Sequence, residues 1–182
     1  IIYIMGIITS RFRRKRYRII MLGLDASGKT TLLYCSKLND VVNTIPTIGF
    51  NYEKIKFKKC KFEVWDIGGQ DKIRELWYHY FNYCDGVIYV IDSADTERLK
   101  DSLLNLQNLI EQDELRNCPF LIVANKQDLE NARTVKHIRR KIYDTICNNP
   151  NRIRIQGASA IRNIGIVEGL EWLYKSIKIF SK

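Results

Sequence analysis

The sequence predicts an α/β fold in which a mostly parallel, doubly wound sheet carries helices on both faces. Three observations lead to this fold class. Continuous apolar runs of strand length, at 86–92 and 120–125, are typical of parallel strands that are covered on both sides. Apolar residues at helical spacing occur between and after these runs. The chain has 182 residues, which is enough for one domain with a full core.

The first half of this domain is expected to begin with a strand over 17–24. This run is apolar and ends at a glycine-rich turn, and a helix over 29–36 follows. Residues 38–50 contain Asn, Asp and Pro and are interpreted as an irregular loop. Two short strands at 52–57 and 62–65 flank a lysine-rich turn, which makes them a hairpin candidate.

The second half continues the alternation of strands and helices. A weaker helix is expected over 134–147 and a short strand over 153–156. Two further helices have clear apolar periodicity, which predicts that each buries one face against the sheet. Their apolar residues are Leu99, Leu103, Leu106 and Ile110 in the first, and Ile166, Leu170, Leu173 and Ile177 in the second.

The composition excludes several classes of protein. Hydrophobic residues make up 46% and charged residues 27%, and the 10 Gly and 3 Pro do not suit a collagen-like, disordered or repetitive chain. The longest nearly apolar run, 1–9, is far below the roughly 20 residues that span a bilayer, which excludes a polytopic membrane protein. Five scattered Cys and two His do not favour a zinc site and fit a reducing, intracellular compartment.

Positive charge is concentrated near the N-terminus. The net charge is +10, and the segment 11–18 alone holds six positive residues. We therefore expect a basic N-terminal extension over 1–16 and a folded domain over 17–182. On charge alone, nucleic acid and an anionic membrane are both possible partners. Met5 and the residues after it match the M-G-x-x-x-[ST] pattern, so Gly6 is a candidate for myristoylation if Met5 is the true start; the alternative is a chance match.

The strongest chemical signal is the segment GLDASGKT at 23–30. Its spacing, G-x-x-x-x-G-K-[ST], lies directly between a predicted strand and a predicted helix, which indicates a phosphate-binding P-loop. Backbone N–H groups of such a turn and the helix N-terminus face phosphate oxygens. Lys29 is expected to reach the β- and γ-phosphates, and the Thr30 hydroxyl to bind Mg²⁺. The expected nucleotide-binding residues here are Gly23, Leu24, Asp25, Ala26, Ser27, Gly28, Lys29, Thr30 and Thr31.

A second signal, NKQD at 125–128, follows an apolar strand. The Asp128 carboxylate suits guanine, because it can accept hydrogen bonds from both N1–H and the 2-amino group, which adenine lacks. Asn125 belongs to the same motif, and Lys126 can lay its aliphatic stem over the base. A strand-helix-strand unit separates this segment from the P-loop, so the two together indicate a guanine nucleotide site.

The third signal is WDIGGQ at 65–70. Asp66 ends an apolar strand and is expected to hold the hydration shell of Mg²⁺. Gly69 can offer its backbone N–H to the γ-phosphate, because no side chain blocks the approach. Gln70 is placed to orient an attacking water, which makes Gln70 and Lys29 the candidate catalytic residues.

These motifs resemble those of the Arf (ADP-ribosylation factor) and Arf-like family of small GTPases. The similarity is nearly letter for letter at 23–30, 46–51, 65–74 and 125–129, and it extends over about 17–180. The fold that it implies is a single P-loop GTPase domain. The implied cofactors are GTP or GDP with Mg²⁺, and the implied activity is GTP hydrolysis that is slow without an activating protein.

The resemblance also implies roles for residues to which the motifs alone assign none. Thr47 should join Thr30 in binding Mg²⁺ when GTP is bound, and Ser159 and Ala160 align with a loop that reads guanine O6. The hairpin over 51–66 lies between the two switches and slides in register on nucleotide exchange in this family. The implied effector and exchange-factor surface consists of Ile48, Gly49, Phe50, Trp65 and Tyr80.

Partners follow from the same resemblance. They are a guanine nucleotide exchange factor, a GTPase-activating protein that supplies an arginine, coat or tether effectors, and an anionic membrane surface. The expected state is a monomer without nucleic acid, cytoplasmic and reversibly bound to the Golgi or another endomembrane. One alternative is an Arf-like, GTP-gated interaction protein for a cargo carrier or cytoskeletal factor, with little hydrolysis. A P-loop nucleoside kinase is less consistent with the NKQD segment at 125–128.

Overall fold

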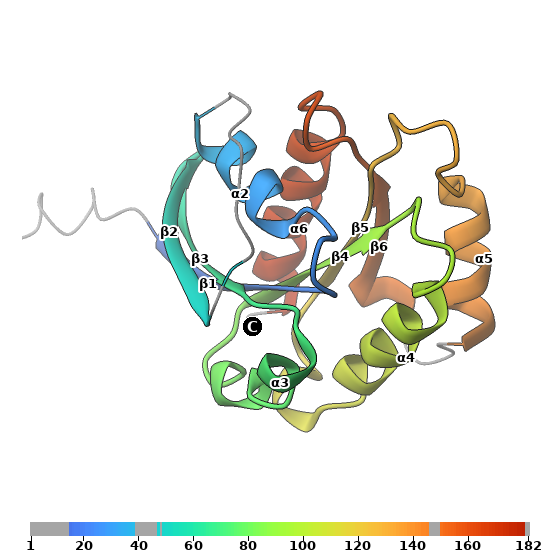
Figure 1. Cartoon of the computed structure of the whole chain (residues 1–182). Helices are drawn as coiled ribbons and strands as arrows, with labels where there is room; N and C mark the ends of the chain where they lie inside the picture. The colour runs from blue at the N-terminus through green and yellow to red at the C-terminus, as the bar shows by residue number, and fades with distance from the viewer. Residues whose placement is uncertain (1–14, 39–46, 48, 146–149, 181–182) are drawn as a thin grey trace, which may run out of the picture.

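The computed structural model describes residues 15–38, 47, 49–145 and 150–180 (Figure 1). Its centre is a six-stranded sheet in which all neighbouring strands run parallel except the second and third in the chain, which form an antiparallel hairpin. This confirms the predicted mostly parallel sheet. The strands are β1 (Lys15–Leu22), β2 (Phe50–Phe57), β3 (Cys60–Ile67), β4 (Gly86–Asp92), β5 (Phe120–Asn125) and β6 (Ile153–Gly157), and their order is β2-β3-β1-β4-β5-β6.

Helices cover both faces of this sheet, as a doubly wound fold requires (Figure 1). The helices are α2 (Lys29–Leu38), α3 (Asp71–Arg74), α4 (Leu99–Ile110), α5 (Val135–Thr145) and α6 (Ile166–Phe180), with short 3-10 helices η1 (Trp77–Tyr80), η2 (Asp113–Leu115) and η3 (Pro150–Arg152). Helices α2 and α6 bury their apolar residues on one face, and α4 and α5 bury theirs on the other.

Strand β1 shows how the sequence produces the two layers. Ile19 and Met21 belong to the core beneath α2 and α6, whereas Ile20 and Leu22 belong to the core beneath α4 and α5. Successive side chains of a strand point to opposite faces, so an unbroken apolar run is what a strand covered on both faces needs. The four side chains are fully buried.

The expected boundaries differ from the structure at β1 and in the hairpin, where β2 starts at Phe50 rather than 52 and β3 spans Cys60–Ile67 rather than 62–65. Strand β1 starts at Lys15 because the parallel ladder pairs Lys15 with Cys60, and this backbone pairing continues beyond the apolar run. It ends at Leu22 because Gly23 has a φ of +141°, outside the extended region. Strands β4 and β5 have the predicted bounds, and the hairpin of β2 and β3 is confirmed. Helix α3 and the 3-10 helices were not predicted, and most of the loop predicted at 38–50 lies outside the described residues.

The topology places the motif-bearing loops together. The carboxyl ends of parallel strands β1, β3, β4, β5 and β6 lie at the same edge of the sheet, and the three motifs lie at the ends of β1, β3 and β5. A ligand site is expected at this edge of an open α/β sheet. No helix in the part of the chain that the structure describes is long and apolar enough to cross a membrane.

Candidate functional site

The turn after β1 is shaped by its first glycine. A Cβ atom on Gly23 would lie 2.3 Å from the Val90 carbonyl oxygen of β4, and the positive φ of this residue is one that other side chains rarely adopt. The turn therefore passes closely over the neighbouring strand before α2 begins at Lys29. Lys29 is buried, and its Nζ donates to the carbonyl oxygens of Gly23 (3.0 Å) and Leu24 (2.8 Å).

A cavity of about 530 Å³ lies between this turn and the segment after β3. It brings together residues that are far apart in the sequence, and all but Gly68 and Lys126 were predicted for the phosphates, the cation or the attacking water; Lys126 was predicted for the base. Its walls are formed by Asp25, Ala26, Gly28, Lys29, Thr30, Thr31, Thr47, Gly68, Gly69, Gln70 and Lys126. Leu24 and Ser27, also predicted, line a separate small crevice on the other side of the turn.

Three oxygen-bearing side chains meet behind this cavity. The Thr30 hydroxyl donates to Asp66 Oδ2 at 2.6 Å and lies 2.9 Å from the Thr47 hydroxyl, which is 3.4 Å from the same carboxylate oxygen. Asp66 is fully buried, and its Oδ1 has no partner among the described residues. Burial raises the pKa of Asp66, although the Thr30 hydrogen bond and the Lys29 charge oppose the rise. Hard oxygen ligands suit Mg²⁺, so these residues fit the predicted cation.

The segment after β3 packs directly on the P-loop. A Cβ atom on Gly69 would lie 2.3 Å from the backbone nitrogen of Asp25, so only glycine permits this approach. The Gly68 N–H donates to the Gly49 carbonyl at 2.9 Å, and Trp77 Nε1 donates to the Gly68 carbonyl at 3.0 Å. The Gly69 carbonyl in turn accepts from Arg74 at 2.9 Å.

Gln70 completes this wall of the cavity. It directly precedes α3, but its side chain makes no capping hydrogen bond to that helix. Its Oε1 is buried and has no hydrogen-bond partner within the described ranges. A buried amide oxygen without a partner is costly, so the arrangement favours a ligand or a water at this position.

A second hollow, of about 110 Å³, adjoins the first and contains the predicted guanine-reading residues. It is lined by Gly28, Thr31, Asn125, Lys126, Asp128, Leu129, Ala160 and Ile161. Asp128 Oδ1 accepts from the Ser159 hydroxyl at 2.5 Å. This contact brings Ser159 beside the NKQD segment, which is the position that the family resemblance implies for it.

Asn125 has a different position from its neighbours in the motif. Its side chain is buried, its Nδ2 donates to the Ser27 carbonyl (2.9 Å), and its Oδ1 accepts from the Ala160 N–H (3.0 Å). The residue therefore links the P-loop, its own loop and the loop after β6. We assign it to this connection in addition to the base-binding hollow that it lines, since its amide NH₂ group has two N–H donors.

Three residues of the expected effector surface lie together, Phe50 and Trp65 on the hairpin and Tyr80 in η1. Phe50 lies 5.1 Å from Trp65 and 5.8 Å from Tyr80, and Trp65 lies 6.0 Å from Tyr80, measured between ring centroids. Half of the Phe50 surface is exposed, and the Arg18 guanidinium lies over the Trp65 ring. Two other predicted residues, Ile48 of this surface and the lipidation candidate Gly6, lie outside the described residues.

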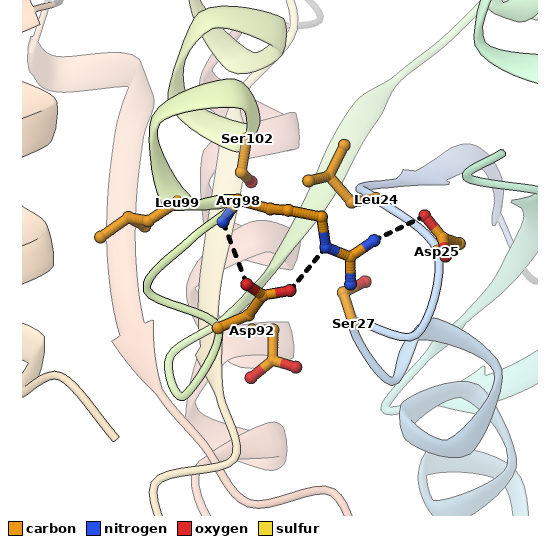
Figure 2. Close-up of a pocket in the computed structure, with 8 residues that line it drawn as sticks. Leu24, Asp25, Ser27, Asp92, Arg98, Leu99 and Ser102 are labelled. Atoms are coloured by element: carbon orange, nitrogen blue, oxygen red, sulfur yellow. Dashed lines mark hydrogen bonds and ion pairs between the residues drawn. The ribbon is translucent and has the colours of Figure 1, made fainter. Parts of the chain in front are cut away.

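Sequence reasoning missed a set of charged residues after β4. Asp92, the last residue of β4, accepts from Lys126 Nζ at 2.6 Å, and Arg98 binds both Asp95 and the P-loop Asp25 (Figure 2). The strand end at Asp92 was a visible signal, because polar residues at this edge of the sheet face the site. The Arg98 contact had no such signal, since it joins residues 73 positions apart.

Comparison with known proteins agrees with this geometry. The sequence matches the model of the ADP-ribosylation factor family over residues 4–177. The structure is similar to that of the Arl6 (BBS3) small GTPase from Trypanosoma brucei with a bound nucleotide analogue, GppNp, at a TM-score of 0.83. The two sequences are 30% identical, and the similarity covers 91% of this chain and 99% of that chain. The chain therefore belongs to the ADP-ribosylation factor family of small GTPases, which bind GTP and hydrolyse it to GDP.

Proposed function

We propose that this GTPase regulates intracellular vesicle and membrane traffic: its GTP-bound form binds an anionic membrane and recruits coat or tether effectors there. GTP binding and hydrolysis follow from the family. Effector recruitment is supported by one observation above all, the connection between the nucleotide cavity and an exposed aromatic surface. Family members generally act with exchange factors, activating proteins and effectors, and this surface is where we place them.

The connection passes through a short segment. Thr47 lies at the cation cluster, and only two residues separate it from Phe50, which begins β2 and is half-exposed. The backbone between them is held by the Gly68 N–H, which donates to Gly49. A change in phosphates at the cavity can therefore reposition Phe50 against Trp65.

The residues of the cavity have distinct roles in hydrolysis. Lys29 neutralises charge on the phosphates, and Gln70 orients the attacking water. When bound, Mg²⁺ would be held by Thr30 and Thr47, with Asp66 on its hydration shell, and would add positive charge at the phosphates. An activating protein would supply a further arginine, which contributes on the order of 10³–10⁵ in rate.

Nucleotide affinity is expected to fall as the pH rises above about 8. Burial lowers the pKa of Lys29 to about 8; Asp66 and Asp25 oppose this shift and Arg74 adds to it. Phosphate binding favours the charged ammonium and so raises its pKa. The complex then holds a proton that the free protein has lost, and the affinity falls by up to about tenfold per pH unit. Equilibrium titration of GDP between pH 7 and 9 measures this slope.

The matched control for this titration is Lys29→Arg. A guanidinium remains charged throughout this pH range, so the variant is expected to show no corresponding slope, whatever its absolute affinity. An equal slope in both proteins would show that another group is responsible.

The membrane part of the proposal rests on the N-terminal sequence. One myristoyl chain binds membranes only marginally, and a polybasic segment is a common second signal. The candidate acceptor Gly6 and the six positive residues of 11–18 would supply both signals. We infer that GTP binding exposes this combined anchor, and that the protein is cytoplasmic and reversibly bound to the Golgi or another endomembrane.

Flotation on liposomes tests this anchor. The chain would begin at Met5, be co-expressed with an N-myristoyltransferase, and be loaded with GDP or a non-hydrolysable GTP analogue. We expect binding to anionic vesicles in the GTP form alone. Replacing Arg13 and Arg14 by Ala should weaken this binding by about 30-fold, since each basic residue contributes ~1 kcal/mol at such a surface.

The control replaces Arg139 and Arg140, which are exposed on α5, and changes the net charge by the same amount. It should bind like the parent chain if the segment 11–18 is the anchor. Equal flotation in both nucleotide states would contradict a switch and indicate a constitutive anchor. Absence of flotation in both states would contradict the membrane role.

The second candidate function is an Arf-like, GTP-gated interaction protein for a cargo carrier or cytoskeletal factor. The structural similarity to Arl6 favours this alternative, because that protein is itself an Arf-like GTPase. In that case flotation would be absent, and stimulated hydrolysis would remain nearly absent as well.

A further inference from the structure

Arg98 joins the loop after β4 to the P-loop. Its Nε donates to Asp95 Oδ2 at 2.6 Å and its NH1 donates to Asp25 Oδ1 at 2.9 Å (Figure 2). In the figure the Arg98 side chain extends from the start of α4 toward Asp25 of the P-loop. One planar cation thus contacts two acidic side chains from different loops.

The contact with Asp25 is not needed to order the loop itself. The Arg98 backbone N–H already donates to Asp95 Oδ1 at 3.0 Å, three residues away, and this closes the turn before α4. The bond to Asp25 reaches across 73 residues to another element. Its effect must therefore be sought at the P-loop.

Asp25 lies between the phosphate cavity and the small crevice described above. It lines both the phosphate cavity and the small crevice in which Arg98 lies. Its backbone nitrogen is in close packing with Gly69, so Asp25 is at the end of the cavity where Thr47, Gly69 and Gln70 also lie. This is the end at which we expect the γ-phosphate, and a carboxylate there has the same sign of charge.

Without Arg98 this carboxylate would be a free negative charge beside the phosphates. Two like charges a few ångströms apart repel more strongly near a protein surface than in bulk water. The side chains of Arg98 and Asp25 are 40% and 42% exposed, so solvent screens this repulsion and keeps its effect on nucleotide affinity modest. GTP carries the additional negative charge of the third phosphate. A free Asp25 carboxylate would therefore weaken the binding of GTP more than the binding of GDP.

We propose that Arg98 is a specificity-determining positioning residue: by binding the Asp25 carboxylate it neutralises a negative charge at the γ-phosphate end of the cavity and preserves affinity for the triphosphate relative to the diphosphate. Asp95 holds the guanidinium from its other side. This inference concerns the nucleotide site and does not depend on the membrane role.

A double-mutant cycle tests the proposal with the full chain, using GppNp and GDP as probes in equilibrium titrations with Mg²⁺. We expect Arg98→Ala to weaken GppNp binding by about tenfold and GDP binding by less than about threefold. In an Asp25→Asn background, where the charge is absent, Arg98→Ala should change either affinity by less than about twofold. Lys100→Ala, which removes an exposed positive charge from the first turn of α4, is the control and should leave the ratio of the two affinities unaltered.

A merely structural role for Arg98 would give a different pattern. Equal loss of both nucleotides, or an undiminished loss in the Asp25→Asn background, would overturn the proposal. Arg98→Lys provides a second variant that keeps the charge but loses the planar fork. It is expected to keep the GppNp to GDP ratio within about threefold of the parent, and a loss as large as that of Arg98→Ala would also overturn the proposal.

Discussion

Replacing Gln70 by Leu is expected to reduce hydrolysis in the presence of an activating protein by roughly 10³-fold or more. Leucine has a similar size but offers no hydrogen bond, so the attacking water loses the group that orients it. The Oε1 of Gln70 is buried at the cavity wall without a partner in the described part of the chain, which is the arrangement that such a role requires. The variant should therefore accumulate in its GTP-bound form.

Single-turnover phosphate release from GTP-loaded protein, with and without the activating protein, measures this loss. Gln107→Leu makes the same chemical change on α4, where the Gln107 amide bonds to Glu111, and serves as the control. If Gln70→Leu hydrolysed GTP at the parent rate with its activating protein, the assignment of Gln70 would be wrong.

Replacing Asp128 by Asn is expected to lower the affinity for GDP by at least about 10²-fold and to raise the relative affinity for xanthosine diphosphate. The carboxylate accepts hydrogen bonds from guanine N1–H and from the 2-amino group. The NH₂ group of an Asn side chain would instead face one of these two guanine donors and could not accept its hydrogen bond. Xanthine carries a carbonyl in place of the 2-amino group and can accept from that donor. The Ser159 hydroxyl bond to Asp128 Oδ1 does not exclude the base, since each carboxylate oxygen can accept more than one hydrogen bond.

Competition between GDP and xanthosine diphosphate for the refolded or freshly exchanged protein gives the ratio of their affinities directly. The control is Asp113→Asn in η2, an exposed carboxylate outside the site. An unaltered preference for guanine in Asp128→Asn would place base recognition elsewhere.

The positions of the motif residues could be anticipated because apolar runs reveal strand ends. Asp66 is the penultimate residue of β3 and Asn125 the last residue of β5, and parallel strands bring their carboxyl ends to one edge of the sheet. Their convergence at one site follows from this local pattern and the topology. Thr47 and Tyr80 were assigned only by resemblance, since neither lies in a periodic segment.

Long-range pairs between polar side chains could not be anticipated in the same way. The contacts of Arg98 with Asp25 and of Lys126 with Asp92 depend on how two loops lie relative to each other, and no local pattern specifies this. The start of β1 at Lys15 is a similar case, because pairing with β3 rather than apolar character extends the strand. Backbone ladders and charge pairs of this kind arise from tertiary structure.

The buried Asn125 side chain gives the nucleotide site a mechanical property. Because it joins Ser27 of the P-loop to Ala160 of the loop after β6, hydrogen bonds connect the surface that holds the phosphates to the surface that holds the base. Displacement at either end is transmitted to the other. An exchange factor that displaces the P-loop would therefore also weaken the contacts with guanine. It would release the whole nucleotide without contacting the base.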